Sequence, residues 1–168
     1  MTTKPYHTLI LFIYLLSVIQ ISQSQGSDHE FKVQGQVYCD VCRAQFITKL
    51  STFMKGATVR LECRDRENDT QTSFSGEGTT DDTGTYHITV TGDHEDDICA
   101  IKLVKSPDSE CSDISAEKFS RDIARVSLTK NSGIATNIRN ANPIGFMKKN
   151  PHEECKSLLE ELGVVPAH

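Results

Sequence analysis

Several features of enzymes and of nucleic-acid-binding proteins are missing from this sequence of 168 residues. It contains no tryptophan, and its 23 acidic residues outnumber its 18 Lys and Arg, which gives a net charge of -5. An acidic chain repels polyanions, so we expect no nucleic-acid partner. The Gly-x-Ser-x-Gly elbow of hydrolases, the His-Glu-x-x-His zinc motif and a phosphate-binding glycine loop are also absent from the sequence. We therefore expect no enzymatic activity and no cofactor.

Long hydrophobic runs are scarce as well. Residues 9–21 are nearly continuous apolar sequence, but a helix needs roughly 20 such residues to span a bilayer. A basic residue, Lys4, precedes this run, and residues 22–24 (Ser-Gln-Ser) form the small-x-small pattern that signal peptidase cleaves. The sequence thus predicts a secretory signal at 1–24 and a mature domain at 25–168. Cleavage removes one cation and no acid, so the mature charge becomes -6, with no membrane insertion afterwards.

Six cysteines follow the predicted signal: Cys39, Cys42, Cys63, Cys99, Cys111 and Cys155. An even number of cysteines in an oxidising compartment predicts three disulfides. Asn68-Asp69-Thr70 is the only Asn-x-Ser/Thr sequon, and its polar surroundings predict an exposed loop with an N-glycan on Asn68. Together these features predict a secreted, extracellular protein.

Alternation of apolar and polar residues predicts most of the strands. In the first, residues 31–38, Phe31, Val33 and Val37 share one face with Cys39, so the Cys39 thiol points into the core. Further strands are expected at residues 57–63, 72–79, 85–90, 98–105 and 123–129, with a tight turn at 81–84. Many short strands and little helix predict a small antiparallel β-sandwich or barrel.

The remaining segments are less regular. Residues 44–55 are expected to form an irregular or partly helical crossover, and residues 131–145 a Gly/Asn/Pro-rich excursion. Near the end, Asn150 as cap and Pro151 as first helical residue predict a short helix that stops at Gly163. Its apolar face is expected to comprise Cys155, Leu158, Leu159 and Leu162.

Two chemical alternatives concern the cysteines. Cys39-Asp40-Val41-Cys42 matches the Cys-x-x-Cys pattern of redox proteins, but no βαβ pattern surrounds it and four further cysteines offer structural partners. Zinc binding with histidine ligands lacks a second closely spaced ligand pair. The candidate histidines are His87, His94 and His152. Structural disulfides are the favoured interpretation.

A calcium site is a third alternative. Residues 93–97 (Asp-His-Glu-Asp-Asp), with Asp81 and Asp82, offer the carboxylate oxygens that this hard cation prefers. Their spacing does not match an EF-hand loop, so a solvated, charged turn is favoured.

The region around Cys39 resembles the signature of a known family, the olive major pollen allergen (Ole e I-like, pollen extensin-like) proteins. The matching positions are Gly35-x-Val37-Tyr38-Cys39-Asp40-x-Cys42-Arg43. Similarity extends along the mature chain through Gly56-Ala57-x-Val59-x-Leu61-x-Cys63, Thr80-Asp81-x-x-Gly84-x-Tyr86 and Asn142-Pro143-Ile144-Gly145-Phe146. Val41 stands where the signature has Thr, Asn or Pro, a difference that bears on the subfamily rather than the fold.

This resemblance implies an antiparallel β-barrel or sandwich of about seven strands. It also implies that the first cysteine pairs with the fifth, the second with the sixth and the third with the fourth. In this sequence the pairs would be Cys39–Cys111, Cys42–Cys155 and Cys63–Cys99. Tyr38 is predicted to face away from the core, where it would either act as an exposed interface anchor or pack over the Cys42–Cys155 bridge.

The resemblance further implies a plant protein of pollen or another reproductive tissue, with roles in pollen hydration, germination and tube growth, and possible allergenicity. The leading hypothesis is a non-enzymatic extracellular ligand of a cell-surface receptor kinase ectodomain. The alternative is a cell-wall module that binds polysaccharide, in which Lys148 and Lys149 would meet acidic pectin. The net charge of the mature chain argues against that alternative.

Overall fold

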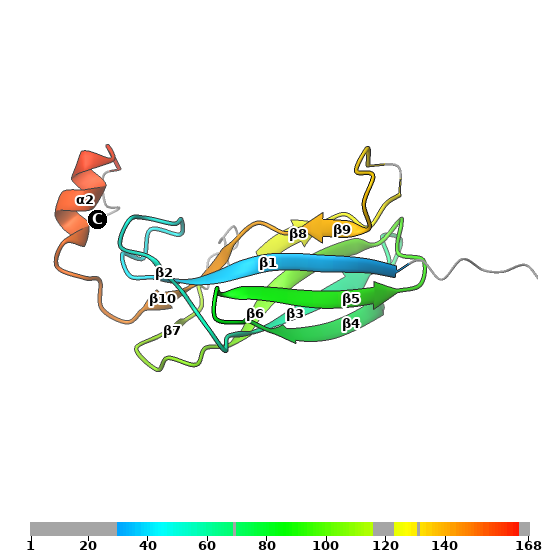
Figure 1. Cartoon of the computed structure of the whole chain (residues 1–168), viewed down its shortest axis with the longest axis horizontal. Coiled ribbons are helices and arrows are strands. Elements are labelled where there is room, and N and C mark those ends of the chain that lie inside the picture. The colour runs from blue at the N-terminus through cyan, green and yellow to red at the C-terminus, as the bar shows by residue number, and fades with distance from the viewer. Residues whose placement is uncertain (1–29, 69, 116–122, 131, 165–168) are drawn as a thin grey trace, which may run out of the picture.

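The structure is a computed structural model that describes residues 30–68, 70–115, 123–130 and 132–164. Within these ranges two β-sheets pack face to face as an elongated sandwich, and one short helix lies near the C-terminus (Figure 1). The predicted small β-sandwich with three disulfides and a short C-terminal helix is confirmed.

The first sheet is organised around its long strand, β1 (Glu30–Asp40). Along its first half β1 pairs with β5 (Thr85–Thr91) in antiparallel and with β9 (Ile138–Asn140) in parallel. Along its second half it pairs with β2 (Thr52–Phe53) in antiparallel and with β10 (Ile144–Lys148) in parallel. One strand therefore links the two ends of the molecule.

The second sheet has the strand order β4 (Thr72–Thr79), β3 (Thr58–Arg64), β6 (Ile98–Lys105), β8 (Ile123–Val126), and every ladder in it is antiparallel. A short strand of the first sheet, β7 (Cys111–Asp113), pairs with β10. The inward residues of both sheets form one core, whose fully buried members include Leu61, Tyr86, Ile101 and Phe146. The alternation that predicted these strands thus reflects one face turned to the core and one to solvent.

Two predictions about the first sheet need correction. The excursion at residues 131–145 contains β9 and leads into β10, and both pair with β1 in parallel, whereas only antiparallel pairing was expected. These strands are short, and Pro143, which has no N–H to donate, lies between them. Ala141 still donates its N–H to the Gln34 carbonyl at 2.8 Å, so β9 and β10 follow β1 as one interrupted strand.

The helix α2 (Cys155–Glu161) begins later than predicted, with Glu154 at its N-cap in place of Asn150. Residues 150–153 form a bend and a turn instead, and the His152 N–H donates to the Val41 carbonyl at 3.0 Å. Gly163, at φ +70°, ends the helix as expected. The predicted face is buried at Cys155, Leu158 and Leu159, but Leu162 is exposed.

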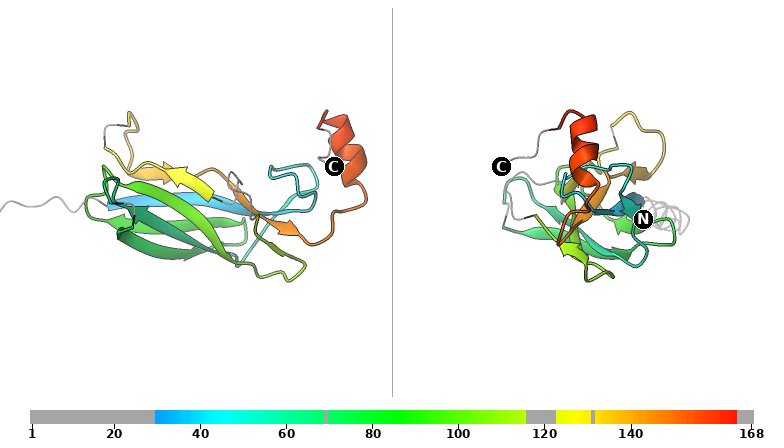
Figure 2. Two further views of the ribbon diagram at one scale, coloured as in Figure 1. Left: turned by 180° about the vertical axis from the view of Figure 1, so that it is seen from behind. Right: turned by 90° about the vertical axis from the view of Figure 1, so that its left-hand side faces the viewer.

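Helix α2 and the segment between β1 and β2, residues 41–51, lie together at one end of the sandwich (Figure 2). Cys42, Cys155 and Leu158 form a small buried cluster there, separate from the main core, and partly buried Val41 and Leu50 pack against it. Residues 41–51 are called the β1–β2 loop below. No helix among the described residues has the length and apolarity needed to cross a membrane.

Candidate functional site

The β1–β2 loop turns sharply around a buried carboxylate. The Asp40 side chain is almost fully buried and accepts hydrogen bonds from the N–H groups of Cys42 (3.2 Å) and Gln45 (2.6 Å). Two non-glycine residues of this turn, Arg43 at φ +54° and Gln45 at φ +59°, adopt the left-handed conformation. That conformation costs of order 1–3 kcal/mol per residue and persists only where the surroundings impose it. Asp40 therefore sets the shape of the loop.

Two disulfides fix the start of the loop to the rest of the protein: Cys42 lies in the loop and Cys39 two residues before it, at the end of β1. Cys39 bonds to Cys111 and Cys42 to Cys155, while Cys63 and Cys99 join β3 to β6 inside the core. These are the pairs that the family resemblance implied. Cys39 and Cys42 bond to different partners, and no cysteine of the chain is free, so the structure offers neither a Cys-x-x-Cys redox pair nor thiolate ligands for zinc.

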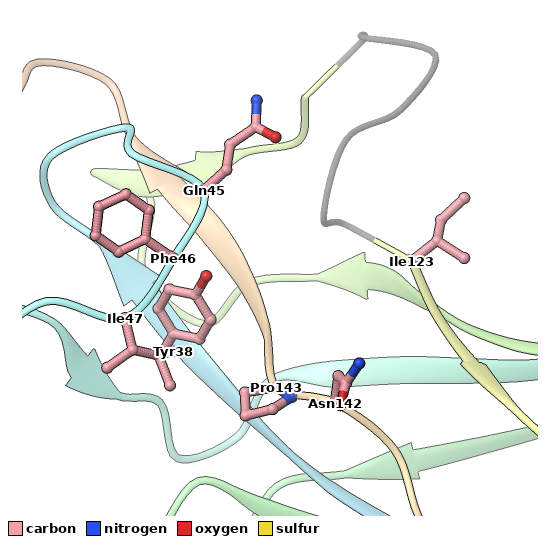
Figure 3. A pocket seen from close by; sticks show the side chains of 7 residues that line it. All are labelled: Tyr38, Gln45, Phe46, Ile47, Ile123, Asn142 and Pro143. Atoms are coloured by element: carbon pink, nitrogen blue, oxygen red, sulfur yellow. The ribbon is translucent and has the colours of Figure 1, made fainter. Parts of the chain in front are cut away.

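A pocket of about 530 Å³ lies beside this loop (Figure 3). Phe46 and Ile47 come from the loop, Asn142 and Pro143 from the link between β9 and β10, and Ile123 from the start of β8. Tyr38 and Gln45 complete the lining. Figure 3 shows the Tyr38 ring between the loop and β10. We call this hollow the loop pocket; β1 and the β9–β10 link of the first sheet, β8 of the second sheet and the loop all contribute to it.

The Tyr38 side chain is buried against Gly145. It faces away from the core, as predicted, but only 2% of it is exposed, so it is not an exposed interface anchor. Its ring packs on Gly145, where a Cβ atom would lie 2.7 Å from the ring carbons. In the sequence, only Gly145 hinted at this contact, because a glycine leaves room for a ring to pack on the backbone. The apolar side chains that do reach solvent at the pocket are Ile47 and Ile123, each nearly half exposed.

The charged groups at this end are mostly paired. Arg43 donates to the Asp113 carboxylate and to the Lys148 carbonyl, both at 2.8 Å, and Lys49 lies 2.9 Å from Glu161 on α2. Of the two lysines considered for pectin binding, Lys149 lies 3.7 Å from Glu110. The lining of the loop pocket carries no formal charge.

The acidic segment considered for calcium uses its side chains internally. Asp97 accepts hydrogen bonds from Ser73 (2.5 Å) and His94 (2.8 Å), and the His94 ring packs edge-on against Phe74. Asp81 caps its own turn by accepting from Thr83 and Thr85. Within the part of the chain that the structure describes, no group of three acidic, His or Cys side chains is placed to hold a metal ion. His87 lies on β5, and His152 lies before α2.

Asp97 should contribute to acid sensitivity. Burial raises the pKa of its carboxyl, but the hydrogen bonds from Ser73 and His94 outweigh this and lower the pKa below its usual value. A depressed pKa stabilises the fold at pH values above the ordinary carboxyl range, and this stabilisation is lost as the pH falls through the folded-state value. Asp97→Asn should therefore be less stable than the wild type at pH 7. Between about pH 4 and pH 2, the stability of this variant should fall less than that of the wild type. Urea midpoints measured across that range test this; parallel curves for wild type and variant would contradict it.

Asn68 lies on the exposed loop between β3 and β4, as the sequence predicted. Thr70 Oγ1 donates to Asn68 Oδ1 at 2.7 Å, and the Asn68 N–H donates to Asp65. Asn68 is therefore accessible at a turn, while its glycosylation stays a prediction.

We expect Asn68→Gln, expressed in a secretory host, to lose the mass of one N-glycan with stability unchanged to within about 0.5 kcal/mol. Intact-mass measurement of the secreted protein tests this. Thr70→Ala should give the same loss, and Thr70→Ser should retain the glycan. An unchanged mass for Asn68→Gln would contradict the prediction.

Comparison with known proteins decides the family. The profile of the family described as "Pollen protein Ole e 1 like" matches residues 29–163. The chain belongs to this family. It is 56% identical over 140 residues to the "Olee1-like protein" of Betula pendula, covering 83% of this chain and 84% of that protein. It is 51% identical to the "Pollen allergen Che a 1" of Chenopodium album, covering 92% of each.

A solved relative supports the same assignment. The crystal structure of the major plantain pollen allergen Pla l 1 superposes with a TM-score of 0.66 at 38% identity, covering 75% of this chain and 99% of that one. The Ole e 1-like family consists of secreted, non-enzymatic pollen proteins, and several relatives of this chain are pollen allergens. The predicted family and the absence of enzymatic activity are confirmed at the level of the family.

Proposed function

We propose that this Ole e 1-like protein is an extracellular signalling ligand that binds the ectodomain of a cell-surface receptor kinase during pollen hydration, germination and tube growth. One observation carries the proposal: an uncharged pocket bordered by exposed Ile47 and Ile123 is held by a loop that two disulfides and buried Asp40 fix in place. A surface that is already ordered loses little conformational entropy on binding. Secretion into the extracellular space or cell wall belongs to the same proposal.

The test uses the mature, oxidised protein immobilised as bait for surface extracts of pollen tubes and pistils. We expect it to capture a receptor kinase whose purified ectodomain then binds with saturation. Reduced and alkylated protein should bind the same ectodomain at least about tenfold more weakly, because the loop is no longer fixed. Failure of every captured ectodomain to bind with saturation would refute the signalling proposal. Binding that is unaffected by reduction would refute the role of rigidity.

A further inference from the structure

A basic face lies on this acidic protein. The strands of the second sheet carry five cations, Arg60, Arg64, Lys102, Lys105 and Arg125, against two carboxylates, Glu62 and Glu77. The sheet therefore has a surplus of three positive charges, although the whole chain has a net charge of -5. Charge is thus segregated, and the net value conceals a surface that attracts anions.

The two carboxylates on this face are shared among several cations. Glu62 contacts Lys102 and lies 3.6 Å from Arg64 and 3.9 Å from Arg60, and Arg60 also lies 2.6 Å from Glu77. The hydrogen bond from Lys102 lowers the pKa of Glu62, so its charge is retained. Arg125 on β8 is exposed and makes no ion pair within the described ranges. Its guanidinium is free to pair with an external carboxylate.

The basic face and the loop pocket meet at one residue. A smaller hollow of about 180 Å³ on the face is lined in part by Lys102, Ile123 and Arg125. Ile123 also lines the loop pocket and is 46% exposed. The two hollows thus form a continuous surface with an uncharged apolar end and a cationic end.

The exposed isoleucines and the adjoining cations indicate which chemical groups a ligand of this surface would carry. Exposed Ile47 and Ile123 gain most by contact with an apolar side chain, because that contact removes apolar area on both partners from water. A hydroxylated sugar ring offers little such area. The adjoining cations favour carboxylates on the same ligand. An acidic protein segment has both groups close together along one chain.

We propose that the loop pocket and the basic face together bind an acidic segment of a partner protein, with an apolar side chain in the pocket and carboxylates against Arg125 and Lys102. This inference rests on the proposed signalling function and specifies the surface that it would use.

The experiment measures saturable binding of fluorescently labelled, oxidised protein to right-side-out plasma-membrane vesicles from pollen tubes. Ile123→Asp and Arg125→Glu should each weaken binding at least about tenfold. Ile134→Asp and Arg66→Glu make the same changes at exposed positions elsewhere and should stay within about twofold of wild type. Added salt should weaken wild-type binding more than Arg125→Glu binding, since a screened charge contact is already missing in that variant.

The outcomes separate the two proposals. Absence of saturable wild-type binding would overturn the signalling function, and this surface with it. Wild-type binding that Ile123→Asp and Arg125→Glu leave intact would overturn the surface alone. Binding that survives protease treatment of the vesicles would show that the partner is not a protein. If Ile123→Asp disturbs β8, Ile47→Asp tests the same pocket from its opposite wall, and it should weaken binding to a similar extent.

Discussion

Replacing Cys42 and Cys155 together by alanine should lower the free energy of unfolding by about 3–5 kcal/mol. The bond closes a separation of 113 residues, the largest of the three, and in its absence the unfolded chain gains the corresponding conformational entropy. It also anchors α2 in the small cluster with Leu158. Equilibrium urea unfolding measures the loss, and limited proteolysis should show early cleavage within α2.

Leu162→Ala, at the C-cap of the same helix, serves as the matched change. Leu162 is exposed, so this variant should unfold within about 0.5 kcal/mol of wild type and keep α2 resistant to cleavage. A loss below about 1 kcal/mol in the Cys42/Cys155 double variant, with α2 still protected, would show that packing and not the disulfide holds this end of the molecule.

Asp40→Asn should lower stability by about 2–3 kcal/mol and loosen the β1–β2 loop. The carboxylate accepts from two backbone N–H groups through its two oxygens, and a carboxamide has only one oxygen to offer. One donor in a largely buried turn would then lose its partner, and hydrogen bonds to charged groups contribute about 1.5–3 kcal/mol. Thermal and urea unfolding measure the cost.

Asp96→Asn makes the same chemical change at an exposed position in the acidic segment and should be nearly neutral. Equal stability of Asp40→Asn and Asp96→Asn would contradict the role given to Asp40. A large loss in both variants would point to overall charge in place of the specific contacts of Asp40.

The regular strands could be predicted because each has one face in the core. In β3, Val59, Leu61 and Cys63 are buried and alternate with half-buried polar residues, as the sequence indicated. Strands β9 and β10 were not predicted because they are short and interrupted around Pro143. Their pairing depends on β1, more than 100 positions earlier in the chain, and local patterns carry no information about such a partner.

The site was less accessible to prediction than the fold. The orientation of Tyr38 followed from strand parity, but its burial depends on the loop and on Gly145. The left-handed conformations of Arg43 and Gln45 have no sequence signature, since neither residue favours that region. One signal was available, namely the Asp at position 40. Asp side chains often accept from the backbone N–H two residues later in an Asx turn, as Asp40 does from Cys42.

Amide hydrogen exchange in the β1–β2 loop tests the central claim most directly, namely that this loop is a fixed surface. The N–H groups of Cys42 and Gln45 both donate to Asp40, so in the oxidised protein they should exchange orders of magnitude more slowly than an unstructured chain. The same amides should lose that protection in Asp40→Asn, whereas the strand amides of β3 keep theirs. Exchange of the Cys42 and Gln45 amides at unstructured rates in the wild-type protein would contradict the account.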